Sequence, residues 1–159
     1  MRIYLASPLG FSEAGRGFLA VLGATLTGLG HEVLDPWQLT DPTRVAAVAN
    51  LPYGPEKRAA WRALNRVTGA NNRAAIDRSD WVLAVLDGID VDSGTAAEIG
   101  YAFARGKIIL GYRGDFRLAA DNEGAIVNLQ VEYFIRESGG DIIATLAALP
   151  EALARFANS

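Results

Sequence analysis

"VLAVLDGIDVDSGTAAEIGYAFARGK", residues 82–107, joins a continuous apolar run to an acidic loop and then to a segment rich in small residues. The apolar run, residues 80–87 with its flanking aspartates, has the composition of a strand that is buried on both faces. Such strands are typical of parallel sheets. The segment that follows the acidic loop ends at Gly106, which favours a helix over residues 94–105. The stretch therefore predicts a strand–loop–helix unit with carboxylates in the loop and near the start of the helix.

The segments on both sides of this unit also alternate between strand and helix patterns. Strands are expected at residues 2–6, 31–35, 80–87 and 107–112 and within 139–145, and helices at 13–29, 56–78, 94–105, 126–137 and 145–156. Residues 36–55 hold four prolines, and we expect a long, partly irregular connection there. The alternation predicts a flavodoxin-like, doubly wound α/β fold, with about five parallel strands and helices on both faces, in a single domain over residues 1–159. Ligands bind such sheets beyond the carboxyl ends of the strands.

The composition excludes several classes of protein. The chain has a net charge of −3 and no cysteine, so it offers no basic surface to nucleic acid and no disulfide or thiol chemistry. No apolar run approaches the roughly 18 residues of a membrane span. The first residues also lack the long apolar region of a signal peptide. We expect a soluble, cytoplasmic protein with neither a nucleic acid nor a membrane as its partner.

Glu98 has two interpretations on pattern alone. Thr95-x-x-Glu98 matches a capping box, in which the Glu98 side chain bonds back to the Thr95 amide. In a ligand site, by contrast, the small neighbours of Glu98 leave room for a substrate, and Asp92 adds a carboxylate that capping does not need. Two carboxylates can divide labour, one as nucleophile and one as polar anchor or acid. A metal site built from Asp87, Asp90 and Asp92 is disfavoured, because the loop is flexible and offers no histidine.

Four motifs follow one another between residue 3 and about residue 130. They are "YLASPLGF" at 4–11, Asn72 with Asp80, "DSGTAAEIGYA" at 92–102 and "NLQ" at 128–130. In this order and spacing they resemble the nucleoside 2-deoxyribosyltransferase family, which moves 2-deoxyribose from one nucleobase to another by double displacement. The resemblance implies nucleosides and free nucleobases as substrates, a place in nucleobase exchange and nucleotide salvage, and no cofactor or metal.

The resemblance also implies roles for individual residues. Glu98 matches the nucleophile that attacks C1′ and forms a glycosyl ester, and Tyr4 matches a tyrosine whose hydroxyl holds that carboxylate. The N-terminus of the helix just before Glu98 favours its ionised form. Asp92 matches a carboxylate that binds sugar hydroxyls, although its pattern equally fits a loop or N-cap aspartate. Gln38 falls where the family has a base-recognising glutamine. Asn128 matches an asparagine that reaches into a neighbouring subunit's sugar site, which implies a homo-oligomer.

Position 72 departs from the family pattern. Better-known members carry an aspartate there, which contacts the base and assists its departure, whereas this chain has Asn72. We expect Asn72 to contact the base, but an amide donates a hydrogen bond without supplying a proton. The proton therefore comes from water, Asp77 or Asp92, or the enzyme uses bases that leave easily.

Two other functions fit the same residues. The first is a hydrolase of the same superfamily that cleaves (deoxy)nucleoside 5′-monophosphates, with water in place of the second base. Ser7, Ser12 and Arg16, in the loop after the first strand, would then hold the phosphate. Glu13 is badly placed beside such a phosphate. The second is a non-catalytic nucleotide-binding domain, which explains the fold but not the paired carboxylates. Base preference and the choice between deoxyribose and ribose stay open.

Overall fold

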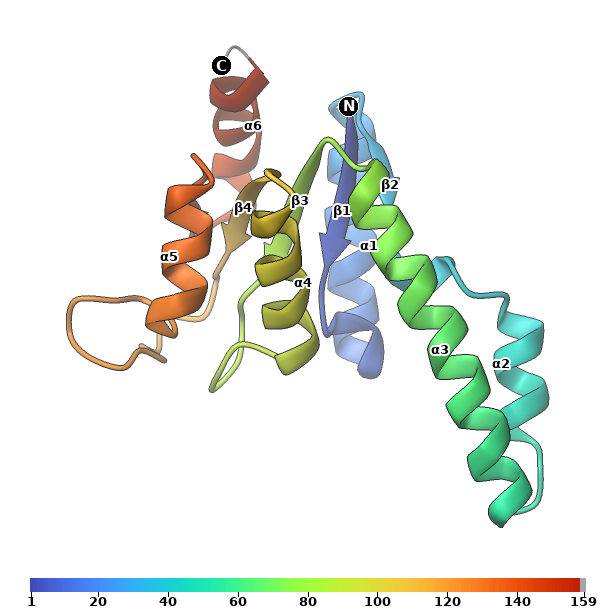
Figure 1. The fold of residues 1–159 in the computed structure, drawn as a ribbon. Coiled ribbons are helices and arrows are strands. Elements are labelled where there is room, and N and C mark those ends of the chain that lie inside the picture. The colour runs from blue at the N-terminus through green and yellow to red at the C-terminus, as the bar shows by residue number, and fades with distance from the viewer. Residues whose placement is uncertain (158–159) are drawn as a thin grey trace.

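The computed structural model describes residues 1–157, with side chains to residue 155, and contains a doubly wound α/β fold (Figure 1). The strands are β1 (Arg2–Ala6), β2 (Glu32–Leu34), β3 (Trp81–Val85), β4 (Ile108–Tyr112) and β5 (Ile142–Ile143). The helices are α1 (Glu13–Gly28), α2 (Pro42–Ala49), α3 (Pro55–Arg78), α4 (Ser93–Ala104), α5 (Leu129–Glu137) and α6 (Leu149–Ala157). Short 3-10 turns lie at η1 (Leu9–Phe11), η2 (Pro36–Gln38) and η3 (Leu146–Ala148). None of the helices in this part of the chain combines the length and the apolar character needed to cross a membrane.

The sheet confirms the predicted fold class. Its five strands run parallel in the order β2-β1-β3-β4-β5, which is the flavodoxin-like order. Every residue of β3 is buried, as expected for a central strand that is covered on both faces. Helices α1 and α6 cover one face, and α3, α4 and α5 cover the other.

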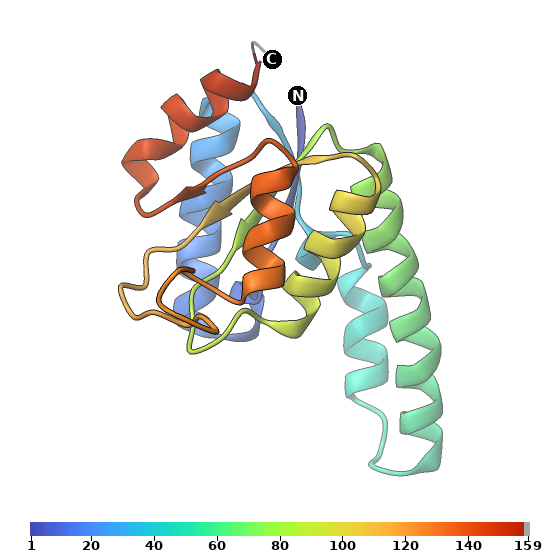
Figure 2. The same cartoon turned by 60° about the vertical axis from the view of Figure 1, so that its left-hand side comes forward.

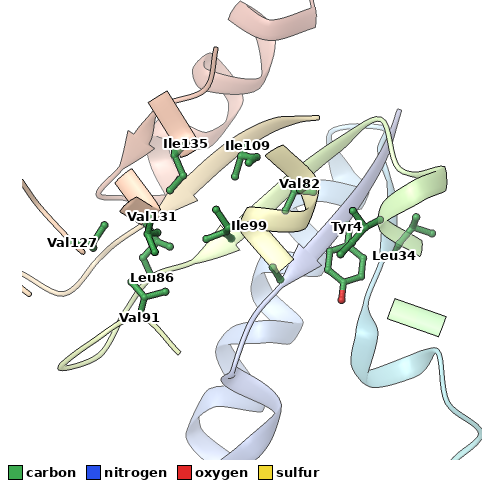
Figure 3. Close-up of a cluster of buried hydrophobic side chains, with 14 of the residues drawn as sticks. Tyr4, Leu34, Val82, Leu86, Val91, Ile99, Ile109, Val127, Val131 and Ile135 are labelled. Carbon is green, nitrogen blue, oxygen red and sulfur yellow. The ribbon is translucent and has the colours of Figure 1, made fainter. Parts of the chain in front are cut away.

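Alternate residues of the strands supply the two apolar layers. In β1, Ile3 and Leu5 pack toward α1 and α6, whereas Tyr4 packs toward α3, α4 and α5. Figure 3 shows this second layer, with the Tyr4 hydroxyl pointing away from the neighbouring apolar side chains. A polar atom from the middle of a strand therefore reaches the space beside α3 and α4.

Residues 36–55 are more regular than predicted, because their prolines begin helical turns rather than interrupt them. Pro36 starts η2 and Pro42 starts α2, positions at which the missing N–H of proline costs nothing. An aspartate precedes each proline and caps the turn, as Asp35 accepts from the Trp37 N–H and Asp41 from the Thr43 N–H. Helices α5 and α6 begin a few residues later than expected, at residues 129 and 149.

Helix α2 and the first half of α3 project beyond the sheet as an antiparallel pair (Figures 1 and 2). At the base of this pair the hydroxyls of Thr40 and Thr68 lie 3.1 Å apart, and the Asn71 side chain donates to the Leu39 carbonyl at 3.0 Å. We call residues 41–67, which lie outside this base, the arm.

Gly140 lies where the backbone of β4 and the end of α5 leave no room for a side chain. A Cβ there would lie 1.7 Å from the Ile109 carbonyl oxygen, which is a backbone atom of a central strand. We therefore expect Gly140→Ala to lower the free energy of unfolding by about 2 kcal/mol or more. Gly23→Ala is the matched control, because its Cβ would meet nothing within 4 Å and helix α1 would gain up to about 1 kcal/mol. Urea denaturation of both variants measures the difference, and equal stabilities would contradict the prediction.

Candidate active site

Three elements bring polar side chains together at Glu98. Glu98 lies in the second turn of α4, Tyr4 in the middle of β1, and Asn72 near the end of α3. The Tyr4 hydroxyl donates to Glu98 Oε1 at 2.6 Å, and the Asn72 Nδ2 donates to the same oxygen at 3.3 Å. Among the described residues no side chain or amide bonds to Oε2. One carboxylate oxygen is thus held by two donors, and the other is free.

The capping-box interpretation of Glu98 is wrong. The N-cap of α4 is Asp92, whose Oδ2 accepts from the Thr95 N–H at 3.0 Å. Thr95 is itself the third residue of the helix and is buried. Because Asp92 already occupies the Thr95 amide, Glu98 makes its bonds to side chains of β1 and α3 instead.

Burial, not the helix N-terminus, dominates the ionisation of Glu98. Removal of the carboxylate from water raises its pKa above the ordinary glutamate value, and the charge of Asp92 adds to the rise. The hydrogen bonds from Tyr4 and Asn72 act in the opposite direction without cancelling it. The favourable effect that we predicted from the helix N-terminus is weak, because it fades within the first turn and Glu98 lies in the second.

Tyr4 is a donor that does not titrate in the ordinary range. Its side chain is fully buried, and burial together with the negative charge of Glu98 raises the pKa of the phenol far above its usual value. The hydroxyl therefore keeps its proton at neutral pH and donates it to Glu98 Oε1.

The side-chain nitrogen of Asn72 makes a hydrogen bond, whereas its side-chain oxygen has no partner among the described residues. Its Nδ2 bonds to Glu98, while its Oδ1 is buried and accepts no hydrogen bond from the described residues. A buried acceptor without a partner is destabilising. This oxygen is therefore available to a donor that comes from outside the chain.

Asp77 cannot supply the proton that Asn72 lacks. It accepts from the Tyr101 hydroxyl and from Arg105 Nε, both at 2.8 Å. The Tyr101 bond is the main reason that the pKa of Asp77 is lowered, and the Arg105 bond and charge add to it. A carboxylate with a lowered pKa is ionised at neutral pH, so Asp77 is not the general acid.

Asp92 and Asn128 make no hydrogen bond to Glu98 in the described structure. Asp92 caps α4 with Oδ2 and lies close enough to Glu98 for its charge to raise the pKa of Glu98. Asn128 is the N-cap of α5, and its Oδ1 accepts from the N–H groups of Gln130 and Val131 at 3.0 and 3.3 Å. Asp92 thus has the N-cap role that its pattern also allowed, whereas the sequence pattern did not predict the capping role of Asn128.

Gln38 makes no hydrogen bond to Glu98, Tyr4 or Asn72. It lies at the end of η2 and lines a cavity of about 600 Å³ beside α1, together with Asp35, Trp37 and Arg16. Its Nε2 donates to Asp35 Oδ2 at 2.8 Å, so Asp35 fixes which way the amide points. Asp35 is a polar residue that the sequence analysis missed, although an aspartate before a proline at the end of a strand signals a cap.

The polar side chains in the loop after β1 form hydrogen bonds within their own segment. The Ser7 hydroxyl accepts from the Leu9 N–H at 3.0 Å, and Ser12 caps α1 by accepting from the Gly15 N–H at 2.9 Å. Arg16 turns back to the Gly10 carbonyl at 3.2 Å. Within residues 1–155, no cluster of three or more acidic, histidine or cysteine side chains has an arrangement that holds a metal.

A family model described as nucleoside 2-deoxyribosyltransferase matches residues 3–130, which is most of the chain. The chain belongs to this family. No curated protein matches the sequence significantly.

Several solved structures share the fold. A 2-desoxiribosyltransferase from Leishmania mexicana is 25% identical, with 98% of this chain and 95% of that chain covered and a TM-score of 0.64. The 2-deoxyribosyltransferase from Bacillus psychrosaccharolyticus is 23% identical, with 94% and 90% covered and a TM-score of 0.64. A CMP N-glycosidase from Clostridium botulinum is 20% identical, with 97% and 98% covered and a TM-score of 0.52. At these identities the last two likenesses support the fold alone.

Proposed function

We propose that this protein transfers a (2-deoxy)ribosyl group from one nucleobase to another through a glycosyl ester on Glu98. The arrangement of Glu98 supports the proposal: Tyr4 and Asn72 fix Oε1, and Oε2 has no partner among the described residues. A carboxylate that is held by one oxygen and open at the other is oriented for attack on a carbon atom.

The reaction proceeds by two displacements at C1′. In the first, Glu98 Oε2 attacks C1′, the bond from C1′ to the base nitrogen breaks, and the base leaves with the bonding electron pair. In the second, a nitrogen of the incoming base attacks C1′ and Glu98 departs as a carboxylate. Water or Asp92 supplies the proton to the leaving base and accepts the proton from the incoming one, because Asn72 carries no acidic proton and Asp77 is held ionised.

Asn72 serves both the nucleophile and the base in this proposal. Its Nδ2 orients Glu98, and its buried, unpaired Oδ1 accepts from an N–H or amino group of the base. Asp92 keeps Oδ1 for a sugar hydroxyl while Oδ2 caps α4. Base recognition by Gln38 and the contribution of Asn128 to a neighbouring subunit stay predictions.

Incubation with deoxyinosine, with and without free adenine, tests the function. Transfer predicts deoxyadenosine and hypoxanthine, formed only when adenine is present. Free deoxyribose in the absence of adenine indicates a hydrolase. A binding domain leaves both deoxyinosine and its 5′-monophosphate unchanged, whereas a monophosphate hydrolase cleaves the latter. A 2-fluoro-2-deoxy nucleoside should in addition slow the breakdown of the ester, so that mass spectrometry finds an adduct on the peptide that contains Glu98. Transfer without any adduct and without ping-pong kinetics would remove Glu98 from the nucleophile's role.

The hydrolase alternative makes a different prediction about phosphate. Because Ser7, Ser12 and Arg16 are engaged within their own loop, 5′-monophosphates should react more slowly than nucleosides. A preference for monophosphates that disappears in Arg16→Ala would favour the hydrolase.

Tyr4→Phe should shift the pH dependence of the reaction. The change removes a hydrogen bond that lowers the pKa of Glu98, so that pKa rises further. Glu98 acts when ionised, and the acidic limb of kcat/KM therefore moves to higher pH. Loss of a bond to a charged group, about 1.5–3 kcal/mol, corresponds to about 10- to 100-fold in rate at neutral pH. Tyr101→Phe removes the same atom from a tyrosine that bonds Asp77, and it should leave the profile unchanged. If the acidic limb of kcat/KM lies at the same pH in both variants, the proposed role of Tyr4 is contradicted.

A further inference from the structure

Two side-chain amides, those of Gln38 and Asn72, are each oriented by a carboxylate. Gln38 Nε2 donates to Asp35 Oδ2 at 2.8 Å, and Asn72 Nδ2 donates to Glu98 Oε1 at 3.3 Å. An ionised carboxylate only accepts hydrogen bonds, so in both pairs the amide nitrogen has to face the carboxylate. The carbonyl oxygens, Gln38 Oε1 and Asn72 Oδ1, therefore face away from it, and neither has a hydrogen-bond partner among the described residues.

Asp35 is buried, and its two oxygens have different partners. Oδ1 accepts from the Trp37 N–H at 3.0 Å, and Oδ2 accepts from the Gln38 side chain. The backbone N–H is an obligatory donor, so it requires an oxygen at the Oδ1 position. The Asp35 side chain is thereby fixed, and the atom at its second position determines which end of the Gln38 amide faces outward.

The strand that leads to Asp35 lies beside the candidate nucleophile. Leu34, the residue before Asp35, is paired with Tyr4 in the sheet, and Figure 3 shows the two side chains side by side. Burial is the main reason that the pKa of Tyr4 is raised, and the charges of Glu98 and Asp35 add to it. Asp35 is thus close enough to act on the hydroxyl that holds Glu98.

Helix α3 contacts the turn that contains Gln38. The Asn71 side chain donates to the Leu39 carbonyl at 3.0 Å. Gln38 comes directly before Leu39, and Asn72 comes directly after Asn71. The bonded pair therefore holds the two oriented amides on neighbouring segments, η2 and α3. Gln38 also borders the cavity of about 600 Å³ beside α1, so its amide faces open space and not a packed core.

A nucleobase that meets both amides meets two hydrogen-bond acceptors. An exocyclic amino group carries N–H donors, whereas a carbonyl at the same ring position is itself an acceptor. A bound base shields the two oxygens from water, and a site rejects a ligand that leaves such groups unpaired. We propose that Asp35 is a positioning residue that sets base specificity: it holds Gln38 so that, with Asn72, the site selects amino-bearing bases such as adenine and cytosine over hypoxanthine and uracil. The inference rests on the proposed function, in which a base binds beside Glu98.

Capping alone does not account for the bond between Asp35 and Gln38. Asp41 also precedes a proline, and its Oδ1 accepts from the Thr43 N–H at 2.8 Å as Asp35 accepts from Trp37. The same Asp41 oxygen accepts from the Thr43 hydroxyl, and no side-chain amide of the described residues bonds to Asp41. The two aspartates therefore share the cap and differ in the amide, which makes Asp41 a matched control.

Asp35→Asn tests the orientation of Gln38 by the change of one atom. Asparagine keeps an oxygen for the Trp37 N–H, so its NH₂ group replaces Oδ2 and faces Gln38. The Gln38 amide then turns over, accepts with Oε1 and presents Nε2 as a donor. The variant should therefore shift base selection toward the oxo bases by about tenfold or more.

Competition between free bases for a common donor, thymidine, measures the selection. Wild type should use adenine over hypoxanthine and cytosine over uracil, and the change in each ratio between wild type and variant is independent of the intrinsic reactivity of the bases. Gln38→Met leaves the cap intact and should lower the preference for amino bases by about tenfold. Asp35→Asn added to Gln38→Met should change the preference no further, since Asp35 acts through Gln38. Asp41→Asn should keep the wild-type ratios.

Binding of deoxyadenosine and deoxyinosine, measured by calorimetry, separates this inference from the proposed function. Tighter binding of deoxyadenosine that is reversed in Asp35→Asn supports the inference even if no base is exchanged, and absence of exchange would then overturn the proposed function alone. Base exchange whose ratios are the same in wild type, Asp35→Asn and Gln38→Met would overturn the inference and leave the proposed function in place. A change in the ratios that Asp41→Asn reproduces would also overturn it, because loss of a cap would then explain the effect.

Discussion

Glu98→Gln should lower the rate of base exchange by at least about 10⁴-fold, which is the scale on which loss of a nucleophile acts. Glutamine keeps the shape of the side chain and an oxygen that accepts from Tyr4 and Asn72, so the loss reflects chemistry and not a cavity. Glu98→Ala should be as inactive. The measurement is the initial rate of deoxyadenosine formation from deoxyinosine and adenine. Near-full activity of Glu98→Gln would show that Glu98 does not form the ester.

The same variant should be more stable than the wild type at neutral pH. Burial raises the folded-state pKa of Glu98, so the stability associated with its protonated form is complete below the unfolded-state pKa and is lost as the pH rises through the folded-state value. A glutamine at position 98 does not ionise, so the variant keeps this stability as the pH rises. If the difference is about 1 kcal/mol, Tm at pH about 7.5 rises by about 2–4 °C, and the gain disappears below pH about 4. Glu137→Gln, at an exposed position on α5, is the control.

The fold was predictable because its signals are local. The apolar run at residues 80–87 indicates a strand covered on both faces, and the patterns before and after it indicate the helices. Residues 36–55 were misread because proline was taken as a breaker, whereas Pro36 and Pro42 occupy the first positions of η2 and α2. The projection of the arm had no local signal, because it depends on how α3 continues past the sheet (Figure 1).

The site was predictable only in part. No local pattern links Tyr4 to Glu98, which are 94 positions apart, and the family resemblance alone suggested the pair. Neither source suggested that Asn72 bonds Glu98, because family members carry an aspartate there and two carboxylates repel each other. The capping role of Asp92 was one of its two interpretations, but that of Asn128 was missed because the resemblance directed attention to the substrate.

Asn72→Asp should change the reaction more than any other substitution that keeps Glu98. Asn72 Nδ2 lies 3.3 Å from Glu98 Oε1, so a carboxylate in its place would lie beside a second, partly buried carboxylate. Two carboxylates that share a site cannot both ionise easily, and they titrate as a coupled pair. The singly protonated pair is the productive form, because it contains one ionised nucleophile and one acid that can protonate the leaving base.

This pairing predicts a specific change in the pH profile. Wild type should show an acidic limb from Glu98 and no second limb from position 72, since an amide does not titrate. Asn72→Asp should add a limb at higher pH, where the pair loses its second proton, and should favour donors whose base must be protonated to leave. That acid is worth about 10²- to 10⁴-fold for such donors. Asn65→Asp adds the same charge to an exposed position on α3 and serves as the control. The measurement is kcat/KM for purine and pyrimidine donors between pH about 4.5 and 8. An unchanged profile and an unchanged order of bases would show that position 72 touches neither Glu98 nor the base during the reaction.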